Sequence, residues 1–290
     1  MKRRRLLLLL IFSLVVVMGA AWPISAFAAT QPRLGTSTSF AVLAAAGITN
    51  SGATNITGDV GTFPTTSETG FAGPAPNTVT LAPGSVNHAG DAVTQGARVD
   101  EVTAYNDLAG QTPCPALAGG TLDGRTLIPG CYNFSSSAIL NVGQTLTLSG
   151  FGIYVFQIGS ALTIGNGTIV SLINGAMACG VFWQVTSSAT IGTAPANFQG
   201  TLIAGTSISV NTGAVWTGRA LAGALAPSGA VTLLSNTIIR PGAGCAGLPF
   251  TGIPLSLRGG FPWQLALIGI AGAVGALVLG SSVRARRRSG

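Results

Sequence analysis

Short segments rich in Thr, Val, Ile and Leu fill the chain from Thr121 to Ile239, and Gly, Asn or Ser ends each of them after a few residues. Helices need longer runs without such breaks, so this punctuation predicts short β-strands. Representative strands are expected at 146–148, 153–158, 162–164, 169–173, 181–185, 201–204, 208–210 and 231–233.

Related phrases recur among these segments, each with a hydroxyl residue between two apolar ones. The central hydroxyls belong to Thr147, Thr163, Thr190, Ser209 and Thr232, at spacings of 16, 27, 19 and 23 residues. Such loose periodicity favours a β-solenoid whose coils carry loops of unequal length. A β-sandwich of short strands is the alternative.

One segment has the pattern of a helix. From 89 to 108 there is no proline, and apolar and polar residues alternate at spacings near three and four until Gly110. We expect an amphipathic helix that lays its apolar side along the solenoid. The residues expected on that side are Val93, Ala97, Val99, Ala104, Tyr105 and Leu108.

The charge of the chain is concentrated at its ends. The formal net charge is +7, but nine of the fourteen basic residues lie within 2–5 and 258–288. Residues 29–247 keep five Arg against seven acids, a net charge of −2. A nucleic-acid partner is therefore not expected.

The N-terminal end has the form of a secretory signal. Four cations at 2–5 precede an apolar run from Leu6 to Met18 and the small-x-small pattern Ala26-Phe27-Ala28. We expect a signal peptide, 1–28, cleaved after Ala28. An uncleaved anchor is the alternative, although the run is shorter than the ~20 residues that cross a bilayer.

The C-terminal end carries three elements in order: Leu248-Pro249-Phe250-Thr251-Gly252, an uncharged apolar stretch over 261–283, and a cationic tail over 284–290. The stretch is long enough for a transmembrane helix, and the cations predict a cytoplasmic C-terminus. This order resembles the LPxTG cell-wall sorting signal of Gram-positive surface proteins. The resemblance implies that a sortase cuts between Thr251 and Gly252 and joins Thr251 to peptidoglycan. A plain membrane anchor is the alternative, and both place residues 29–247 outside the cell.

Four cysteines, Cys114, Cys131, Cys179 and Cys245, lie in this exported part, where disulfides can form. Three pairings are possible. Because two turns bracket a short excursion between Cys114 and Cys131, we expect that pair and hence Cys179 with Cys245. A zinc site is not expected, since the sequence has one histidine and no CxxC pattern.

From about Leu34 to Ile239 the chain closely resembles the bacterial and fungal ice-binding domain, also called DUF3494. The matching phrases include Ile56-Thr57-Gly58-Asp59-Val60-Gly61, Thr103-Ala104-Tyr105-Asn106-Asp107-Leu108, Leu127-Ile128-Pro129-Gly130-Cys131-Tyr132, Phe156-Gln157-Ile158 and Val181-Phe182-Trp183-Gln184-Val185. The resemblance implies a right-handed, discontinuous parallel β-helix of triangular section, all-β except for the long helix along one face. Phe156, Phe182 and Trp183 would belong to its core.

The resemblance also implies ice binding through a flat outward face. Alternate side chains of a strand point to opposite faces, so large residues such as Leu162 and Ile164 are expected inside and their small partners outside. These outward candidates are Thr145, Thr147, Ala161, Thr163, Ser188, Thr190, Ser207, Ser209, Ala230 and Thr232, none of them charged. Stacked strands repeat every 4.7 to 4.9 Å, close to a repeat of the ice lattice.

We therefore expect a monomeric, non-enzymatic protein without cofactor or metal, whose partners are ice, a sortase, peptidoglycan and the membrane. A surface adhesin of the same fold that binds carbohydrate, matrix or another cell is the alternative, with Trp216 as one aromatic candidate. A polysaccharide lyase or hydrolase is not expected. Residues 29–247 have no Lys, and Asp59 and Asp123, the carboxylates of the strand region, each follow or precede a glycine like turn residues.

Overall fold

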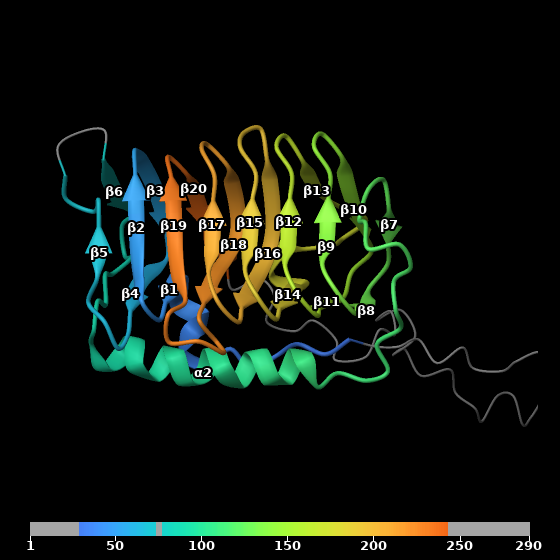
Figure 1. Cartoon of the computed structure of the whole chain (residues 1–290), viewed down its shortest axis with the longest axis horizontal. Coiled ribbons are helices and arrows are strands. Elements are labelled where there is room, and N and C mark those ends of the chain that lie inside the picture. Colours follow the sequence, from blue (N-terminus) through green and yellow to red (C-terminus); the bar gives the residue numbers. More distant parts are fainter. Residues whose placement is uncertain (1–28, 74–76, 243–290) are drawn as a thin grey trace, which may run out of the picture. The chain divides into compact units, whose positions relative to one another are not determined.

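The strands stack in parallel into a solenoid with three faces, as the computed structural model shows (Figure 1). The structure describes residues 29–73 and 77–242. Every pair of named strands in these ranges is parallel. This pairing confirms the solenoid and excludes the sandwich, whose sheets are antiparallel.

Seven strands form a separate sheet, here called the seven-strand face. In spatial order they are β5 (Glu68–Thr69), β2 (Gly47–Ser51), β19 (Ala230–Leu234), β17 (Ile208–Val210), β15 (Ala189–Ile191), β12 (Leu162–Ile164) and β9 (Ala138–Leu140). Every second side chain along these strands is buried. One side of the sheet therefore faces the core and the other faces water.

The second sheet bends to make the other two faces. Its eight-strand face contains β6 (Thr78–Leu81), β3 (Ala53–Thr57), β20 (Thr237–Ile239), β18 (Val215–Ala222), β16 (Asn197–Ala204), β13 (Ile169–Ile173), β10 (Thr145–Ser149) and β7 (Thr126–Leu127). Its helix-covered face contains β4 (Asp59–Thr62), β1 (Phe40–Ala44), the ends of β18 and β16, β14 (Val181–Val185), β11 (Tyr154–Ile158) and β8 (Gly130–Phe134). The described residues also include two short 3-10 helices, Gly35–Ser39 and Ala178–Gly180.

Glycines allow β16 and β18 to turn the corner between these two faces. Gly200 and Gly218 pair across the two strands, and Gly200 has a φ of +106°. A Cβ at Gly218 would lie 1.8 Å from the Gly200 carbonyl oxygen. Only a residue without a side chain fits so close an approach.

The order of the coils is discontinuous. On one side, the first strands, β1 to β3, pair with the next coil in sequence, β4 to β6. On the other side they pair with β18, β19 and β20, near the other end of the described chain. Between them, the chain runs through α2 (Ala92–Ala109) to the far end of the solenoid and then coils back (Figure 1). The eighteen residues of α2 extend about 27 Å, close to the six strand spacings, about 29 Å, of the face that it covers.

The helix begins and ends close to its predicted bounds. Asp91 caps the N-terminus by accepting a hydrogen bond of 2.8 Å from the Thr94 amide, and this bond lowers the pKa of Asp91. The predicted start at 89 is three residues early. It rested on the absence of proline, whereas the Asp91 cap sets where the helix begins. Gly110 follows the last turn, as predicted.

The buried side of α2 agrees with the predicted one at Ala97, Ala104, Tyr105 and Leu108 and differs from it at Val93 and Val99. Val93 and Val99 are 44% and 64% exposed. The buried residues are Thr94, Ala97, Glu101, Ala104, Tyr105 and Leu108. These positions follow the 3.6-residue period of one helix face, and Val93 and Val99 fall outside it.

Aromatic rings stack along the interior of the solenoid. Phe156 and Trp183 lie 4.0 Å apart at their centroids, and Phe198 continues the stack 5.2 Å beyond Trp183. Phe182 is also fully buried, but it lies in the second core cluster, with helix residues such as Tyr105. The predicted core aromatics are thus confirmed in two separate layers, one inside the coils and one beneath α2.

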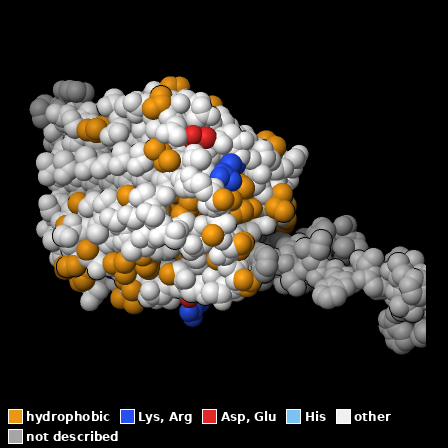
Figure 2. Space-filling model, turned by 45° about the vertical axis from the view of Figure 1, so that its right-hand side comes forward, with side chains coloured by type: hydrophobic (Ala, Val, Ile, Leu, Met, Phe, Trp, Pro, Cys, Tyr) orange, Lys and Arg blue, Asp and Glu red, His pale blue; other side chains and the backbone are white. Residues whose placement is uncertain are grey.

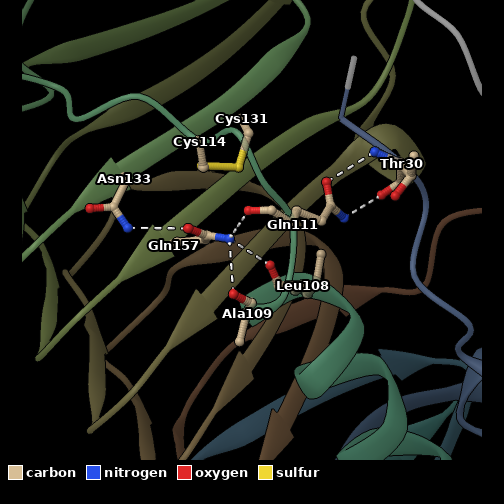
Figure 3. Close-up of a disulfide and its surroundings, with 8 residues drawn as sticks. All are labelled: Thr30, Leu108, Ala109, Gln111, Cys114, Cys131, Asn133 and Gln157. Atoms are coloured by element: carbon tan, nitrogen blue, oxygen red, sulfur yellow. Dashed lines mark hydrogen bonds between the residues drawn. A yellow bond between two sulfur atoms is a disulfide. The ribbon is translucent and has the colours of Figure 1, made fainter. Parts of the chain in front are cut away.

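A disulfide between Cys114 and Cys131 ties the segment after α2 to β8 (Figure 3). This confirms the first predicted pair. Close to it, the Gln157 side-chain amide donates to the carbonyls of Leu108 at 2.8 Å and Gln111 at 3.0 Å. The carbonyls at a helix C-terminus have no partner within the helix, so Gln157 adds hydrogen bonds at the end of α2 and joins it to β11.

Several predicted features fall outside the described residues. They are the signal peptide, Cys245 with its predicted bond to Cys179, the motif over 248–252 and the stretches over 261–283 and 284–290. Within 29–73 and 77–242, no helix is long and apolar enough to cross a membrane.

Candidate functional site

A straight row of hydroxyl side chains runs across the seven-strand face, with one residue from each of six neighbouring strands. The strand register aligns Thr163 with Thr190, Thr190 with Ser209, and Ser209 with Thr232. It continues from Thr232 to Thr49 and from Thr49 to Thr69. We call these six residues the hydroxyl row. Ile139 of β9 extends the row by one apolar residue beside Thr163.

The hydroxyls of this row are open to water. Thr49, Thr69 and Thr163 are exposed, and Thr190, Ser209 and Thr232 are half-buried by their neighbours. None of the six hydroxyls has a protein partner among the described residues. The space-filling view shows that charged side chains are few and scattered over the visible surface (Figure 2). The face therefore offers regularly spaced, uncharged donors and acceptors.

A second row lies two residues before the first, at the start of each strand or one residue before it. It contains the predicted residues Ala161, Ser188, Ser207 and Ala230, and the register adds Gly47 beside Ala230. Its hydroxyls are used within the protein. The Ser188 hydroxyl lies 2.6 Å from that of Thr206, and the Ser207 hydroxyl accepts a 3.2 Å hydrogen bond from the Ala230 amide. Ser188 and Ser207 thus link successive coils.

Comparison with known proteins identifies the family to which the chain belongs. A family model described as "Ice-binding-like" matches residues 42–239. The chain belongs to the ice-binding-like family. A protein of Nostoc called "Ice-binding protein" is 40% identical over 230 residues, which cover 78% of this chain and 80% of that protein.

Solved structures carry the same fold. An ice-binding protein from an Antarctic biological consortium is 40% identical, with a TM-score of 0.67 over 76% of this chain and 96% of that one. An ice-binding protein of the ascomycete Antarctomyces psychrotrophicus is 36% identical, with a TM-score of 0.65 over 74% of this chain and the whole of that one. The fold expected from the resemblance, parallel sheets with one helix, is therefore shown.

Two of the ten candidate residues of this ice-binding-like domain lie elsewhere. Thr145 and Thr147 belong to β10, on the eight-strand face, where they pair with Ile169 and Ser171. Their prediction as part of one face with the other eight residues was wrong. The alternation of a strand separates inside from outside, but it does not say which side of a triangular coil the strand occupies.

Two residues of the hydroxyl row were missed. Thr49 comes from the first coil and Thr69 from the second, and Thr49 joins Thr232, more than a hundred residues later in the chain. The phrase Gly47-Ile48-Thr49 repeats the small, apolar and hydroxyl order of Ala230-Val231-Thr232. That order was the available signal, but only the discontinuous stacking places the two phrases side by side.

Residues considered for other chemistries have structural contacts. Trp216 is fully buried and donates its indole N–H to the Gly200 carbonyl at 2.8 Å, so it gives no surface platform for a sugar. Asp59 and Asp123 accept backbone hydrogen bonds from Val86 and Asn141. Among the residues with described positions, no cluster of His, Cys, Asp and Glu could hold a metal ion.

Proposed function

We propose that this protein binds ice through the hydroxyl row and the second row of the seven-strand face. The observation that carries the proposal is the register, which sets six free hydroxyls in one line across six parallel strands. Neighbouring residues of the row are about 4.8 Å apart. Such a line can hold water molecules at a spacing close to that of the ice lattice.

The two rows supply complementary groups to those waters. Threonine methyls favour cage-like water around them, and the free hydroxyls fix the cage to the protein. The second row contributes small side chains, which keep the face flat beside the hydroxyls. An ion would hold its own hydration shell against the lattice, so the lack of charge at the outward positions of both rows also supports ice as the ligand.

Ice-affinity partitioning tests this proposal. Residues 29–247 are frozen slowly into ice with a protein that does not bind ice, and the fraction in the ice is measured for both. We expect strong enrichment of the domain in the ice and exclusion of the control. Equal exclusion of the two proteins would contradict the proposal and favour an adhesin of the same fold.

We further propose that the protein is exported and held at the surface of a Gram-positive cell. The signal pattern before Ala28, the motif over 248–252, the apolar stretch and the terminal arginines support this proposal. Sortase, peptidoglycan and, before cleavage, the membrane would be its partners. A tethered domain would act at the cell boundary, where it attaches the cell to ice or protects its immediate surroundings.

The sorting signal gives a sharp prediction. Changing Thr251 to Ala removes the residue that the sortase would join to peptidoglycan. We expect the protein to move from the fraction released by a muramidase to the membrane fraction. A substitution at Ser256, outside the five-residue motif, is the matched control. If Thr251→Ala and the parent protein distribute equally, sortase anchoring is refuted.

A further inference from the structure

The hydroxyl row crosses a seam between two parts of the chain that are distant in sequence. Thr49 and Thr69 belong to the first two coils, whereas Thr232 and the rest belong to coils formed after α2. At the seam, β1 and β2 pair with β18 and β19. The row is therefore continuous only if noncovalent contacts set the two parts in one plane.

Backbone hydrogen bonds join the two parts at the corner that leads from β18 to β19. The Ala45 amide donates to the carbonyls of Ala222 at 3.1 Å and Gly229 at 3.0 Å, and the Ala46 amide donates to Gly229 at 2.8 Å. The corner itself, 222–229, consists mainly of small residues, and Gly223 has a φ of +101°. The side chains of the corner itself therefore do little to fix its backbone conformation.

Arg98 of α2 binds this corner. Its Nη1 donates to the Ala222 carbonyl at 3.0 Å, and its Nη2 donates to the Gly223 carbonyl at 2.7 Å. The Ala222 carbonyl is one of those that accept from Ala45. The guanidinium also pairs with the carboxylate of Glu101. One side chain thus connects the helix, the corner and the contact between the two coils.

The pair is not the arrangement that stability alone would select. Glu101 is fully buried, and its Oε1 has no partner. Buried ion pairs can often be replaced by apolar residues of similar volume without loss of stability. What an apolar pair cannot supply is a planar fork that holds two carbonyls in a fixed geometry.

We infer that Arg98 and Glu101 are positioning residues of the seven-strand face. Glu101 holds the guanidinium, and Arg98 holds the corner so that Thr49 and Thr232 lie in one plane. The two residues touch neither row and act through the backbone of 222–229. This inference rests on the proposed function, because it assigns the pair a role in the shape of the face.

A double variant, Arg98→Met with Glu101→Leu, tests the inference in the purified protein. It removes both charges together, so we expect a melting temperature close to that of the parent. The fraction retained in ice is expected to fall several-fold because the corner is released. Thr49→Tyr should reduce retention in the parent and change it little in the double variant. Parent-like retention in a double variant with parent-like melting would overturn the inference.

A second variant covers the case in which the double variant melts below the assay temperature. Arg98→Lys keeps a charge beside Glu101, but its single ammonium lacks the fork that reaches both carbonyls. We expect it to fold and to show reduced retention, whereas unchanged retention would overturn the inference.

If the parent itself is excluded from ice, the proposed function fails. Hydrogen exchange at the amides of Ala45 and Ala46 then tests the positioning role independently of ice. Faster exchange in a folded variant than in the parent supports the role, and unchanged exchange refutes it.

Discussion

Replacing Ser209 by Lys is expected to abolish retention of the domain in ice. Ser209 lies in the middle of the hydroxyl row, aligned with Thr190 on one side and Thr232 on the other. A lysine there would stand above a row of short side chains and keep water around its ammonium group. Because the side chain points to solvent, the free energy of unfolding should change by about 0.5 kcal/mol or less. Ice partitioning and thermal unfolding measure the two effects separately.

The matched control places the same charge on the helix. Gln95 is an exposed residue of α2, and Gln95→Lys should leave both retention and melting unchanged. If Ser209→Lys is retained as strongly as Gln95→Lys, the seven-strand face does not bind ice. If both variants lose retention, net charge rather than the position of the lysine controls the result.

The largest loss of stability is expected from Arg98→Ala. This change leaves the carboxylate of Glu101 fully buried without its cationic partner. Removal of one member of a buried ion pair typically costs about 3 to 5 kcal/mol. Urea unfolding of the variant and the parent at pH 7 measures this loss. Arg33→Ala is the control, because its pair with Asp107 lies at the surface, and it should cost far less.

The loss should also depend on pH. Burial raises the pKa of Glu101 to about 7 in the parent, although Arg98 acts to lower it. Without Arg98 the pKa of the folded state rises further above that of the unfolded state. A folded pKa that is raised favours the folded state at low pH and loses that contribution as pH increases. The destabilisation by Arg98→Ala should therefore be smaller near pH 5 than at pH 7, and an equal loss at both would contradict a buried, uncompensated carboxylate.

The strands were predictable because the inside and outside of each coil differ strongly in side-chain size. Segments such as Leu162–Ile164 and Ile208–Val210 have the predicted bounds. Strand β16 was predicted only over its second half, 201–204, because Gly200 resembles a break in the sequence. In the fold, Gly200 is the corner within one continuous strand.

The assembly of the site was only partly predictable. Local alternation identified Thr163, Thr190, Ser209 and Thr232 as outward residues, and the register confirms that they share one face. It could not exclude Thr147, whose phrase has the same alternation on another face, nor include Thr49 of the first coil.

The helix shows a similar limit. Val99 was expected to be buried because it is apolar, but Glu101 takes a buried position because Arg98 lies within reach to pair with it. Hydrophobicity alone does not predict the burial of a residue whose charge is compensated by a neighbour. Arg98 also contacts a corner more than a hundred residues away, which no local pattern reveals.

One measurement compares the same substitution on two faces of the same fold. Thr190→Tyr places a bulky ring in the hydroxyl row, and Thr147→Tyr places it on the eight-strand face. Both residues are half-buried central positions of parallel strands, so their effects on folding should be alike. In ice-affinity partitioning we expect Thr190→Tyr to be excluded and Thr147→Tyr to be retained like the parent. Retention of Thr190→Tyr, or exclusion of Thr147→Tyr alone, would contradict ice binding by the seven-strand face.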